Sequence, residues 1–169
     1  LYMEYSFWIP DFSDLVMAEP LITQNMDSGR VQIFSIDDEE TRDYDDAISF
    51  EKVDKGFRLG IHVSNVASRI ELQGLLHEEA ARRGASFYAV NKVIPMLPSR
   101  YSEQELSLIM GTQRPVVSMY LELDEHSEIL SRSIKSEVLP VRDNLSYRQV
   151  DRQITQEPFA SIMRICNKH

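Results

Sequence analysis

Cysteine is almost absent from this chain, which has 169 residues and a single cysteine, Cys166. One cysteine cannot form a disulfide within the chain, and it cannot supply the paired thiolates of a Cys₂His₂ zinc site. We therefore expect a reducing compartment, with the cytoplasm as the first choice and an organelle as the second. No histidine and acid are evidently arranged to activate Cys166, so an ordinary structural role is favoured over a nucleophilic one.

Long apolar runs are also missing. No stretch approaches the ~20 apolar residues that a membrane-spanning helix needs, so we expect no membrane partner. The acidic residues Glu4, Asp11 and Asp14 interrupt the apolar start, and no secretory signal is readable there. With 43% hydrophobic and 27% charged residues, the composition and length fit one soluble globular domain. The first residue is Leu1 rather than methionine, so we expect a piece of a longer protein.

Basic residues are in short supply: 18 Lys and Arg face 27 Asp and Glu, which gives a net charge of −9. Proteins usually hold a phosphate backbone with a surplus of basic side chains, so this balance argues against a free-standing nucleic-acid-binding module. A metal-dependent nuclease core remains compatible, because its carboxylates hold cations that then meet the phosphate. Such a core would need basic surface from elsewhere to grip a long strand.

Apolar periodicity and turn residues predict a mixed α/β fold, with a curved, largely antiparallel sheet and helices packed against it. The clearest signal is a hairpin, because apolar residues alternate from Phe57 to Val63 after the turn Asp54–Gly56. Gly84 is a candidate helix end, and Ser146 is a candidate N-cap. Strands are expected at 31–36, 47–52, 57–63, 117–123 and 129–139, and helices at 72–83, 146–155 and 158–168.

Residues 1–30 are predicted to form an N-terminal arm or linker that lies on the domain. Pro10 and Pro20 interrupt any long helix in this segment. Its aromatic residues could form a platform for stacking RNA bases, but packing onto the core is the favoured interpretation. These aromatic residues are Tyr2, Tyr5, Phe7, Trp8 and Phe12.

Seven carboxylates crowd into the ten positions from Asp37 to Asp46, between two predicted strands. So many like charges repel one another unless cations neutralise them. Hard cations such as Mg²⁺ take oxygen ligands, and a pair of such ions can stabilise both the attacking and the leaving oxygen of a phosphodiester displacement. From charge alone, a solvated surface loop is the stronger interpretation. An EF-hand calcium loop is excluded, because the central glycine and the glutamate at position twelve are missing.

The spacing of this loop resembles that of the RNB domain, the catalytic domain of the ribonuclease II and ribonuclease R family. The resemblance starts with Ile36-Asp37 and the run from Arg42 to Ala47. It continues in order through Phe57–Ser64, Glu79–Tyr88, Ile94–Pro98, Ser107-Leu108 and Leu145–Val150. Any one segment could occur by chance, whereas the ordered series over about 31–151 is specific. It identifies residues 31–169 as the N-terminal half of an RNB catalytic domain.

The resemblance implies a processive 3′→5′ hydrolytic exoribonuclease that degrades single-stranded RNA to nucleoside 5′-monophosphates with Mg²⁺. Carried over by position, Asp37 and Asp46 are direct metal ligands. Asp43 and Asp45 complete the centre, as ligands or by holding metal-bound waters and the RNA end. Tyr88 stands where the family places an aromatic residue that stacks on a base near the RNA 3′ end. Flanking OB-type domains, of the cold-shock and S1 kinds, are expected in the parent protein.

Several alternatives remain open at this point. His62 could be a base or a metal ligand, although a structural role is favoured. Arg82 and Arg83 could contact phosphate or simply lie on a helix face. The second function considered is a catalytically silent RNB-like protein that binds RNA or regulates. The presence of all four aspartates argues against it, because a decayed site should lose its ligands first.

We predict that the 169-residue chain alone is inactive or nearly so as a nuclease. The resemblance places an arginine-bearing segment, similar to a transition-state clamp for the phosphate, beyond His169. Losing such an electrostatic clamp costs on the order of 10²–10³ in rate or more. The measurement is nucleotide release from single-stranded RNA by the purified chain with Mg²⁺, and robust degradation would contradict the prediction.

Overall fold

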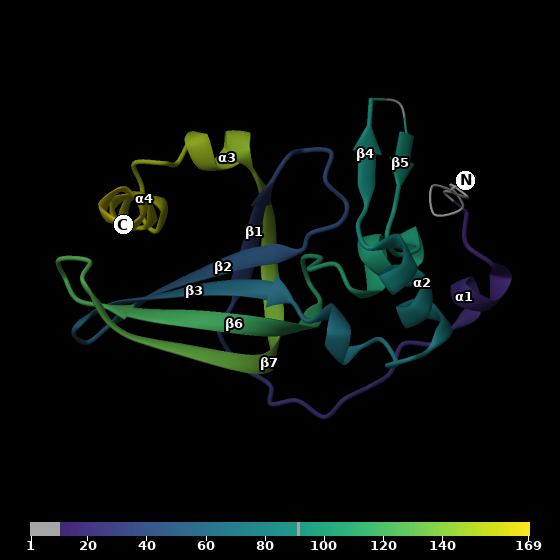
Figure 1. Ribbon diagram of the computed structural model, residues 1–169. Coiled ribbons are helices and arrows are strands. Elements are labelled where there is room, and N and C mark those ends of the chain that lie inside the picture. The colour runs from purple at the N-terminus through teal and green to yellow at the C-terminus, as the bar shows by residue number, and fades with distance from the viewer. Residues whose placement is uncertain (1–10, 91) are drawn as a thin grey trace, which may run out of the picture.

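Five strands form a closed barrel (Figure 1). The computed structural model describes residues 11–90 and 92–169. In barrel order the strands are β1 (Ile33–Asp37), β2 (Asp46–Val53), β3 (Gly56–Ser64), β6 (Gln113–Leu123) and β7 (Ile129–Ser146). The mixed α/β class and the mainly antiparallel sheet expected from the sequence are confirmed. The sequence did not predict that the sheet closes into a barrel.

One parallel pair of strands, β1 with β7, closes the barrel, while the other neighbouring strands are antiparallel. The parallel register places Ile36 opposite Leu145 and Asp37 opposite Ser146. This pairing depends on the length of β7, which continues beyond the predicted end at residue 139 to Ser146. The acidic loop that follows β1 therefore begins beside the chain that follows β7.

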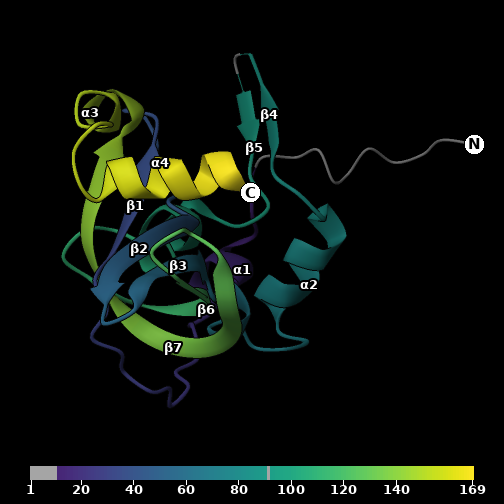
Figure 2. The same cartoon turned by 90° about the vertical axis from the view of Figure 1, so that its left-hand side faces the viewer.

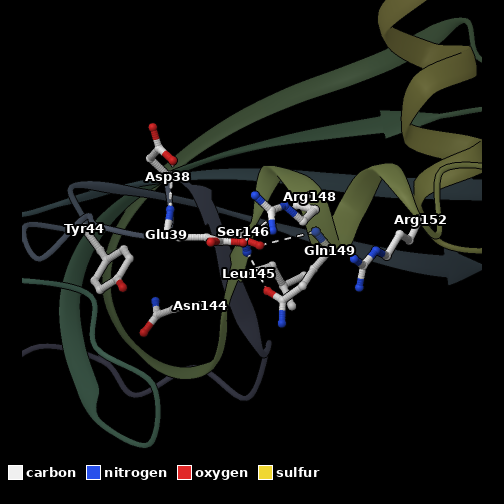
Figure 3. A pocket seen from close by; sticks show the side chains of 9 residues that line it. All are labelled: Asp38, Glu39, Tyr44, Asn144, Leu145, Ser146, Arg148, Gln149 and Arg152. Carbon is white, nitrogen blue, oxygen red and sulfur yellow. Dashed lines mark hydrogen bonds and ion pairs between the residues drawn. The ribbon is translucent and has the colours of Figure 1, made fainter.

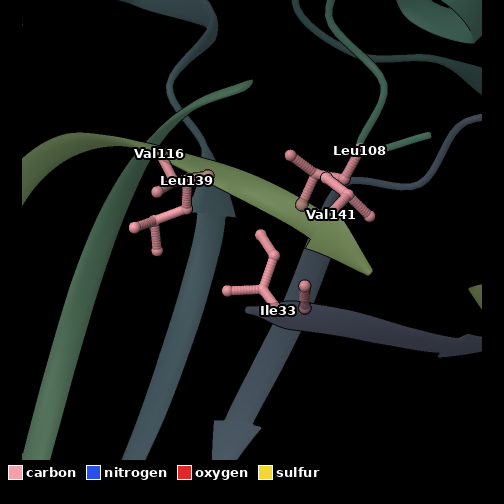
Figure 4. Close-up of a cluster of buried hydrophobic side chains, with 6 residues drawn as sticks. Ile33, Leu108, Val116, Leu139 and Val141 are labelled. Carbon is pink, nitrogen blue, oxygen red and sulfur yellow. The ribbon is translucent and has the colours of Figure 1, made fainter. Parts of the chain in front are cut away.

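Part of the barrel interior is apolar and sealed from solvent (Figure 4). Burying a large aliphatic side chain stabilises a fold by about 1.5–3 kcal/mol. Tyr44, from the acidic loop, packs against this cluster and so connects the loop to the core. The buried cluster consists of Ile33, Ala47, Leu108, Val116, Leu139 and Val141.

The rest of the interior is polar, which corrects the expectation for β3. Its alternation predicted a half-buried strand with His62 on the polar side. The structure buries that polar side inside the barrel and leaves Val63 on the outer face, 49% exposed. The ring nitrogens of His62 lie 2.9 Å and 2.8 Å from the hydroxyls of Ser49 and Ser118. A barrel of five strands has a narrow lumen, and a Cβ at Gly60 would collide with the rings and hydroxyls that fill it.

Two helices that follow β7 cover part of the outer face of the barrel (Figure 2). They are α3 (Tyr147–Asp151) and α4 (Phe159–Lys168). Ser146 caps α3, as the sequence predicts, and the Gln149 side chain completes a capping box with it. On α4 the residues Phe159, Ile162 and Ile165 are buried, and the Phe159 ring meets Phe34 edge to face at 5.9 Å between centroids. The outer face of the sheet is thus a second apolar core.

A smaller group of elements lies beside the barrel: α1 (Asp14–Ala18), α2 (Leu75–Arg83), and the hairpin of β4 (Phe87–Ala89) and β5 (Lys92–Ile94) (Figure 1). Two short turns, η2 (Val66–Ser68) and η3 (Tyr101–Glu105), complete it. Its buried centre consists of Val16, Leu76, Tyr101 and Leu106. Helix α2 ends at Gly84, whose φ of 73° is left-handed, as predicted. None of the helices in the described ranges is long and apolar enough to cross a membrane.

The described part of the predicted arm lies on the domain. The guanidinium of Arg83 sits 3.7 Å from the centroid of the Phe12 ring, and the Ile22 amide donates to the Arg69 carbonyl at 2.8 Å. Packing is therefore the role of Phe12 in this structure. The division of the chain at residue 30 stays a prediction. Four of the aromatic residues lie outside the described residues: Tyr2, Tyr5, Phe7 and Trp8.

We predict that His62 stays neutral well into the acid range. Burial in the barrel lowers the pKa of His62 to about 4, against an ordinary value of 6.5, while the Glu137 charge opposes the shift. Between the two pKa values the His62 ring is protonated in the unfolded chain but neutral in the folded barrel. The His62 contribution to stability is therefore present above pH 6.5 and is lost as pH falls toward 4, by up to ~3 kcal/mol.

The test is an NMR titration of the His62 ring protons, together with urea unfolding at pH 7 and pH 5. The ring signals should not move over this range. A titration midpoint above pH 6 would contradict the prediction.

Candidate metal centre

The acidic loop connects β1 to β2, and the barrel holds both of its ends. Asp37 is the last residue of β1 and pairs with Ser146 of β7, while Asp46 is the first residue of β2 and pairs with β3. The Ser64 amide also donates to the Asp45 carbonyl at 2.8 Å. The strands therefore fix the two terminal carboxylates of the loop relative to each other.

The middle of the loop is held by Ser107, which is fully buried. The Tyr44 amide donates to the Ser107 hydroxyl at 2.9 Å, and that hydroxyl donates to the Arg42 carbonyl at 3.2 Å. The Leu108 amide donates to the Tyr44 carbonyl at 2.9 Å. The pair Ser107-Leu108 belongs to the motif series, but its spacing in the sequence gave no sign that it anchors the acidic loop.

The four predicted aspartates lie close enough to act on one another electrostatically. Burial raises the pKa of Asp37, a hydrogen bond with Ser35 opposes the shift, and the charges of Asp46 and Asp43 raise it further. Burial also raises the pKa of Asp45, followed by the charges of Asp43, Asp46 and Asp37. Each shift has the sign expected for carboxylates that crowd without a counterion. The structure thus brings together the four residues that the sequence singled out.

One atom of the cluster lacks a partner. The Oδ2 oxygen of Asp37 is buried and has no hydrogen bond within the described residues. A buried carboxylate oxygen is costly unless a donor or a cation satisfies it. In the same described ranges, no group of three or more acidic, histidine or cysteine side chains is already arranged as a metal cage. Mg²⁺ does not require one, because it takes one or two carboxylates and completes its octahedron with waters and phosphate oxygens. The all-oxygen donor set therefore fits Mg²⁺.

Tyr88, on strand β4, meets the same cluster. Its hydroxyl donates to Oδ2 of Asp43 at 3.2 Å, and the residue as a whole is 66% exposed. Burial of the hydroxyl raises the pKa of Tyr88, and the adjacent Asp43 charge raises it further. The ring borders a hollow of about 300 Å³ that is also lined by Asp45, Met96 and Leu97. An exposed aromatic face thus stands directly beside the carboxylates.

A second hollow, of about 360 Å³, lies between the acidic loop and α3 (Figure 3). From the loop side it is lined by Asp38, Glu39 and Tyr44, and from the α3 side by Ser146, Arg148, Gln149 and Arg152. An ion pair crosses one part of it, with Nε of Arg148 at 3.5 Å from Oε1 of Glu39. Sequence reasoning did not single out these arginines, because nothing local links residue 148 to residue 39.

Three other residues considered from the sequence lie outside the cluster. His62 is inside the barrel and has the structural role that was favoured. Arg82 and Arg83 both bind Glu79, and the hydrogen bond from Arg82 is the main cause that lowers the pKa of Glu79 to about 2. The Arg83 side chain is 1% exposed and also donates to the Pro95 carbonyl at 2.9 Å, so it packs α2 onto the neighbouring loop.

Two sequence relatives illustrate what this chain is similar to. Ribonuclease R from Thermotoga maritima is 35% identical over 120 residues, which cover 70% of this chain and 17% of that protein. The human 3′-5′ exoribonuclease HELZ2 is 29% identical over 172 residues, which cover 95% of this chain and 6% of that protein. The chain thus spans 17% and 6% of the lengths of these two relatives.

Solved structures give the same fold. Ribonuclease R from Mycoplasma genitalium, solved in complex with double-stranded RNA, superposes with a TM-score of 0.70 at 25% identity, over 78% of this chain and 24% of that one. Yeast Ssd1, described as a pseudonuclease, superposes with a TM-score of 0.73 at 22% identity, over 81% of this chain and 17% of that one, which is a likeness of fold alone. The RNB domain family matches residues 25–163. This chain therefore belongs to the RNB domain family.

Proposed function

We propose that this chain carries the acidic metal centre of a hydrolytic 3′→5′ exoribonuclease, which degrades single-stranded RNA to nucleoside 5′-monophosphates with Mg²⁺. The observation that carries the proposal is the clustering of the four aspartates between β1 and β2, where one buried Asp37 oxygen has no hydrogen-bond partner within the described residues. Membership of the RNB domain family and the relatives named ribonuclease R support the reaction class. The activity of the whole protein is part of the proposal, because the chain spans 17% of such a relative.

In the proposed centre, Asp37 and Asp46 hold Mg²⁺ directly. Asp43 and Asp45 complete the centre, as ligands or by holding water and the RNA end. Bound Mg²⁺ would supply charge neutralisation at the scissile phosphate and a lowered pKa for water. The field of the carboxylates attracts a divalent cation to the rim of the barrel, where the strands hold Asp37 and Asp46 in place.

The proposed reaction is a displacement at phosphorus by water. A bond forms between the water oxygen and phosphorus, and the bond from phosphorus to the 3′ oxygen of the preceding nucleotide breaks. The proton lost by water is balanced by the proton gained by that 3′ oxygen. The products are a nucleoside 5′-monophosphate and an RNA that is one nucleotide shorter, and no covalent intermediate with the protein is expected.

Tyr88 is proposed to stack on a base near the RNA 3′ end. Its hydroxyl bond to Asp43 holds the exposed ring beside the carboxylates, where the terminal nucleotides must lie during hydrolysis. Stacking on an aromatic side chain contributes about 1–3 kcal/mol per base and tolerates any base. This suits an enzyme that degrades many RNA sequences.

A catalytically silent RNB-like protein, which binds RNA or regulates, is the second candidate. The fold likeness to yeast Ssd1, described as a pseudonuclease, is the observation in its favour. The presence of Asp37, Asp43, Asp45 and Asp46 favours hydrolysis. The two candidates differ in one measurement, because a silent protein would release no nucleotide from RNA in the presence of Mg²⁺.

We further propose two features of the whole protein. OB-type domains of the cold-shock and S1 kinds would flank this chain. They would supply the basic surface that binding an RNA backbone requires and that this chain, with a net charge of −9, has little of. The cytoplasm is the proposed location, with an organelle as the second choice, and its basis is the single cysteine.

One prediction of the proposed function concerns hydrolysis. In the protein that contains this chain, Asp45→Asn and Asp46→Asn should each abolish Mg²⁺-dependent nucleotide release, because each removes a charge from the metal centre, while RNA binding stays largely intact. Release from labelled single-stranded RNA and binding of the same RNA are the measurements.

The matched control is Asp54→Asn, in the turn between β2 and β3 at the other end of β2 from Asp46. It should hydrolyse like the parent protein. Parental rates in the Asp45 and Asp46 variants would show that the centre is assigned to the wrong residues.

Another prediction concerns the stability of the folded chain. The pKa values of Asp37 and Asp45 are raised in the fold, so their ionised forms oppose folding above the raised values, and this penalty is relieved as pH falls through them. Without divalent cations at pH 7, Asp45→Asn should therefore raise the free energy of unfolding by about 0.5 kcal/mol, because it removes a carboxylate that partial burial and the neighbouring like charges both disfavour in the fold. Added Mg²⁺ should stabilise the parent chain more than the variant.

Urea unfolding with EDTA, and then with Mg²⁺, measures both effects, again with Asp54→Asn as the control. Equal stabilisation of the parent chain and the Asp45 variant by Mg²⁺ would argue against a metal site at these carboxylates.

A further inference from the structure

The hollow between the acidic loop and α3 joins opposite charges at the edge of the proposed metal centre (Figure 3). Acidic side chains approach it from the loop, and Arg148 and Arg152 approach it from the α3 side. The two arginines are four residues apart, one at the second position of α3 and the other at its C-cap, so they follow each other on one side of the helix. The lining of the hollow therefore includes two arginine side chains from the same helix and its C-cap.

The barrel places these arginines near the carboxylates. Asp37 pairs with Ser146 across the parallel seam of β1 and β7, and neighbouring strands lie about 4.8 Å apart. Ser146, the partner of Asp37 in this pairing, is also the N-cap of α3, and Arg148 lies two residues after it. The first turn of α3 and the Asp37 carboxylate therefore lie at the same rim of the barrel.

Both arginines are available to a new partner. The ion pair of Arg148 with Glu39 joins side chains that are 70% and 54% exposed, and such exposed pairs contribute little to stability. Within the described ranges, no ion pair joins Arg152 to a carboxylate. Several other arginines are already held: Arg58 by Glu122, Arg82 and Arg83 by Glu79, Arg100 by Glu105, and Arg114 by three backbone carbonyls.

We propose that Arg148 and Arg152 form a phosphate-binding subsite for the single-stranded RNA that is engaged at the aspartate centre, and that Glu39 occupies this subsite when RNA is absent. The guanidinium group binds phosphate oxygens with two parallel hydrogen bonds, whereas the ion pair of Arg148 with Glu39 is 3.5 Å long and joins exposed side chains. Glu39 then acts as a stand-in for the phosphate, and incoming RNA displaces it. The inference rests on the proposed function and deepens it, because it assigns a place for the RNA backbone next to the metal centre.

Binding measurements separate this subsite from catalysis. The assay uses the complete protein that contains this chain and a fluorescently labelled oligouridylate, in EDTA, with anisotropy recorded at several KCl concentrations. The double variant Arg148→Gln, Arg152→Gln should weaken binding by about three- to tenfold. It should also lower the slope of log affinity against log salt by up to about 1.4, because two phosphate contacts to a single strand are lost.

Two further variants make the test sharp. Glu39→Gln should tighten binding by roughly twofold, since it removes the competing carboxylate while Arg148 and Arg152 stay in place. Arg132→Gln is the matched control, because Arg132 is an exposed arginine near the opposite end of β7 from Ser146, and its affinity and salt slope should equal those of the parent protein.

The outcomes distinguish this inference from the proposed function. If the double variant binds like the control, or loses affinity at an unchanged salt slope, the subsite is overturned, while hydrolysis by the parent protein would still support the proposed function. Weaker binding by Glu39→Gln would overturn the displacement of Glu39. Equal losses for oligouridylate and for an acidic oligoglutamate peptide would overturn recognition of RNA. A parent protein that neither binds nor hydrolyses RNA would instead contradict the proposed function.

Discussion

The parallel pairing of β1 with β7 is the contact on which the rest of the structure depends. It converts an antiparallel sheet into a closed barrel, which removes the two exposed edges that such a sheet would present to other chains. It also aligns Asp37 with Ser146, so the acidic loop and α3 start at the same rim. The proposed metal centre and the arginine-lined hollow are therefore neighbours because of this one seam.

The acidic loop is held in place against its own repulsion. Burial and then the neighbouring charges raise the pKa of Asp45, so its ionised form destabilises the fold, and the structure offsets this by anchoring the loop backbone on buried groups. Ser107 binds the loop at Tyr44 and Arg42, and the Tyr44 ring packs on the apolar part of the barrel interior. In the proposed function a cation and a phosphate bind at this rim and offset the lost stability, which is a frequent compromise at functional sites.

The barrel interior has an apolar part and a polar part. One part is apolar and stabilises the fold, while the part around His62 is a network of serine hydroxyls and an imidazole that is kept neutral by burial. Full hydrogen bonding makes such a polar lumen tolerable. The apolar outer face of the sheet then packs on α4 rather than facing solvent throughout. The strands thus have two buried faces in places, which a simple alternation of apolar and polar residues does not reveal.

Local signals in the sequence were informative where neighbours in the chain decide the structure. The hairpin turn before β3, the left-handed Gly84 after α2 and the capping box at Ser146 were all predictable, since each depends on residues within a few positions. The end of β7 was misjudged, because its last residues are strand only through pairing with β1. The burial of His62 was not foreseen either, because it results from closure of the barrel through distant strand pairing, which no local pattern encodes.

By itself the sequence determined the chemistry that this chain can offer: four spaced aspartates, an aromatic residue that follows them, and an ordered motif series that marks the RNB domain family. Only the tertiary structure decided how these groups meet. Ser107 reaches Tyr44 across 63 positions of the chain, and Tyr88 reaches Asp43 across 45. Arg148, which follows β7, reaches Glu39, which follows β1, because these two strands pair. Such contacts arise from strand pairing and closure, and these depend on the sum of many distant interactions rather than on any local pattern.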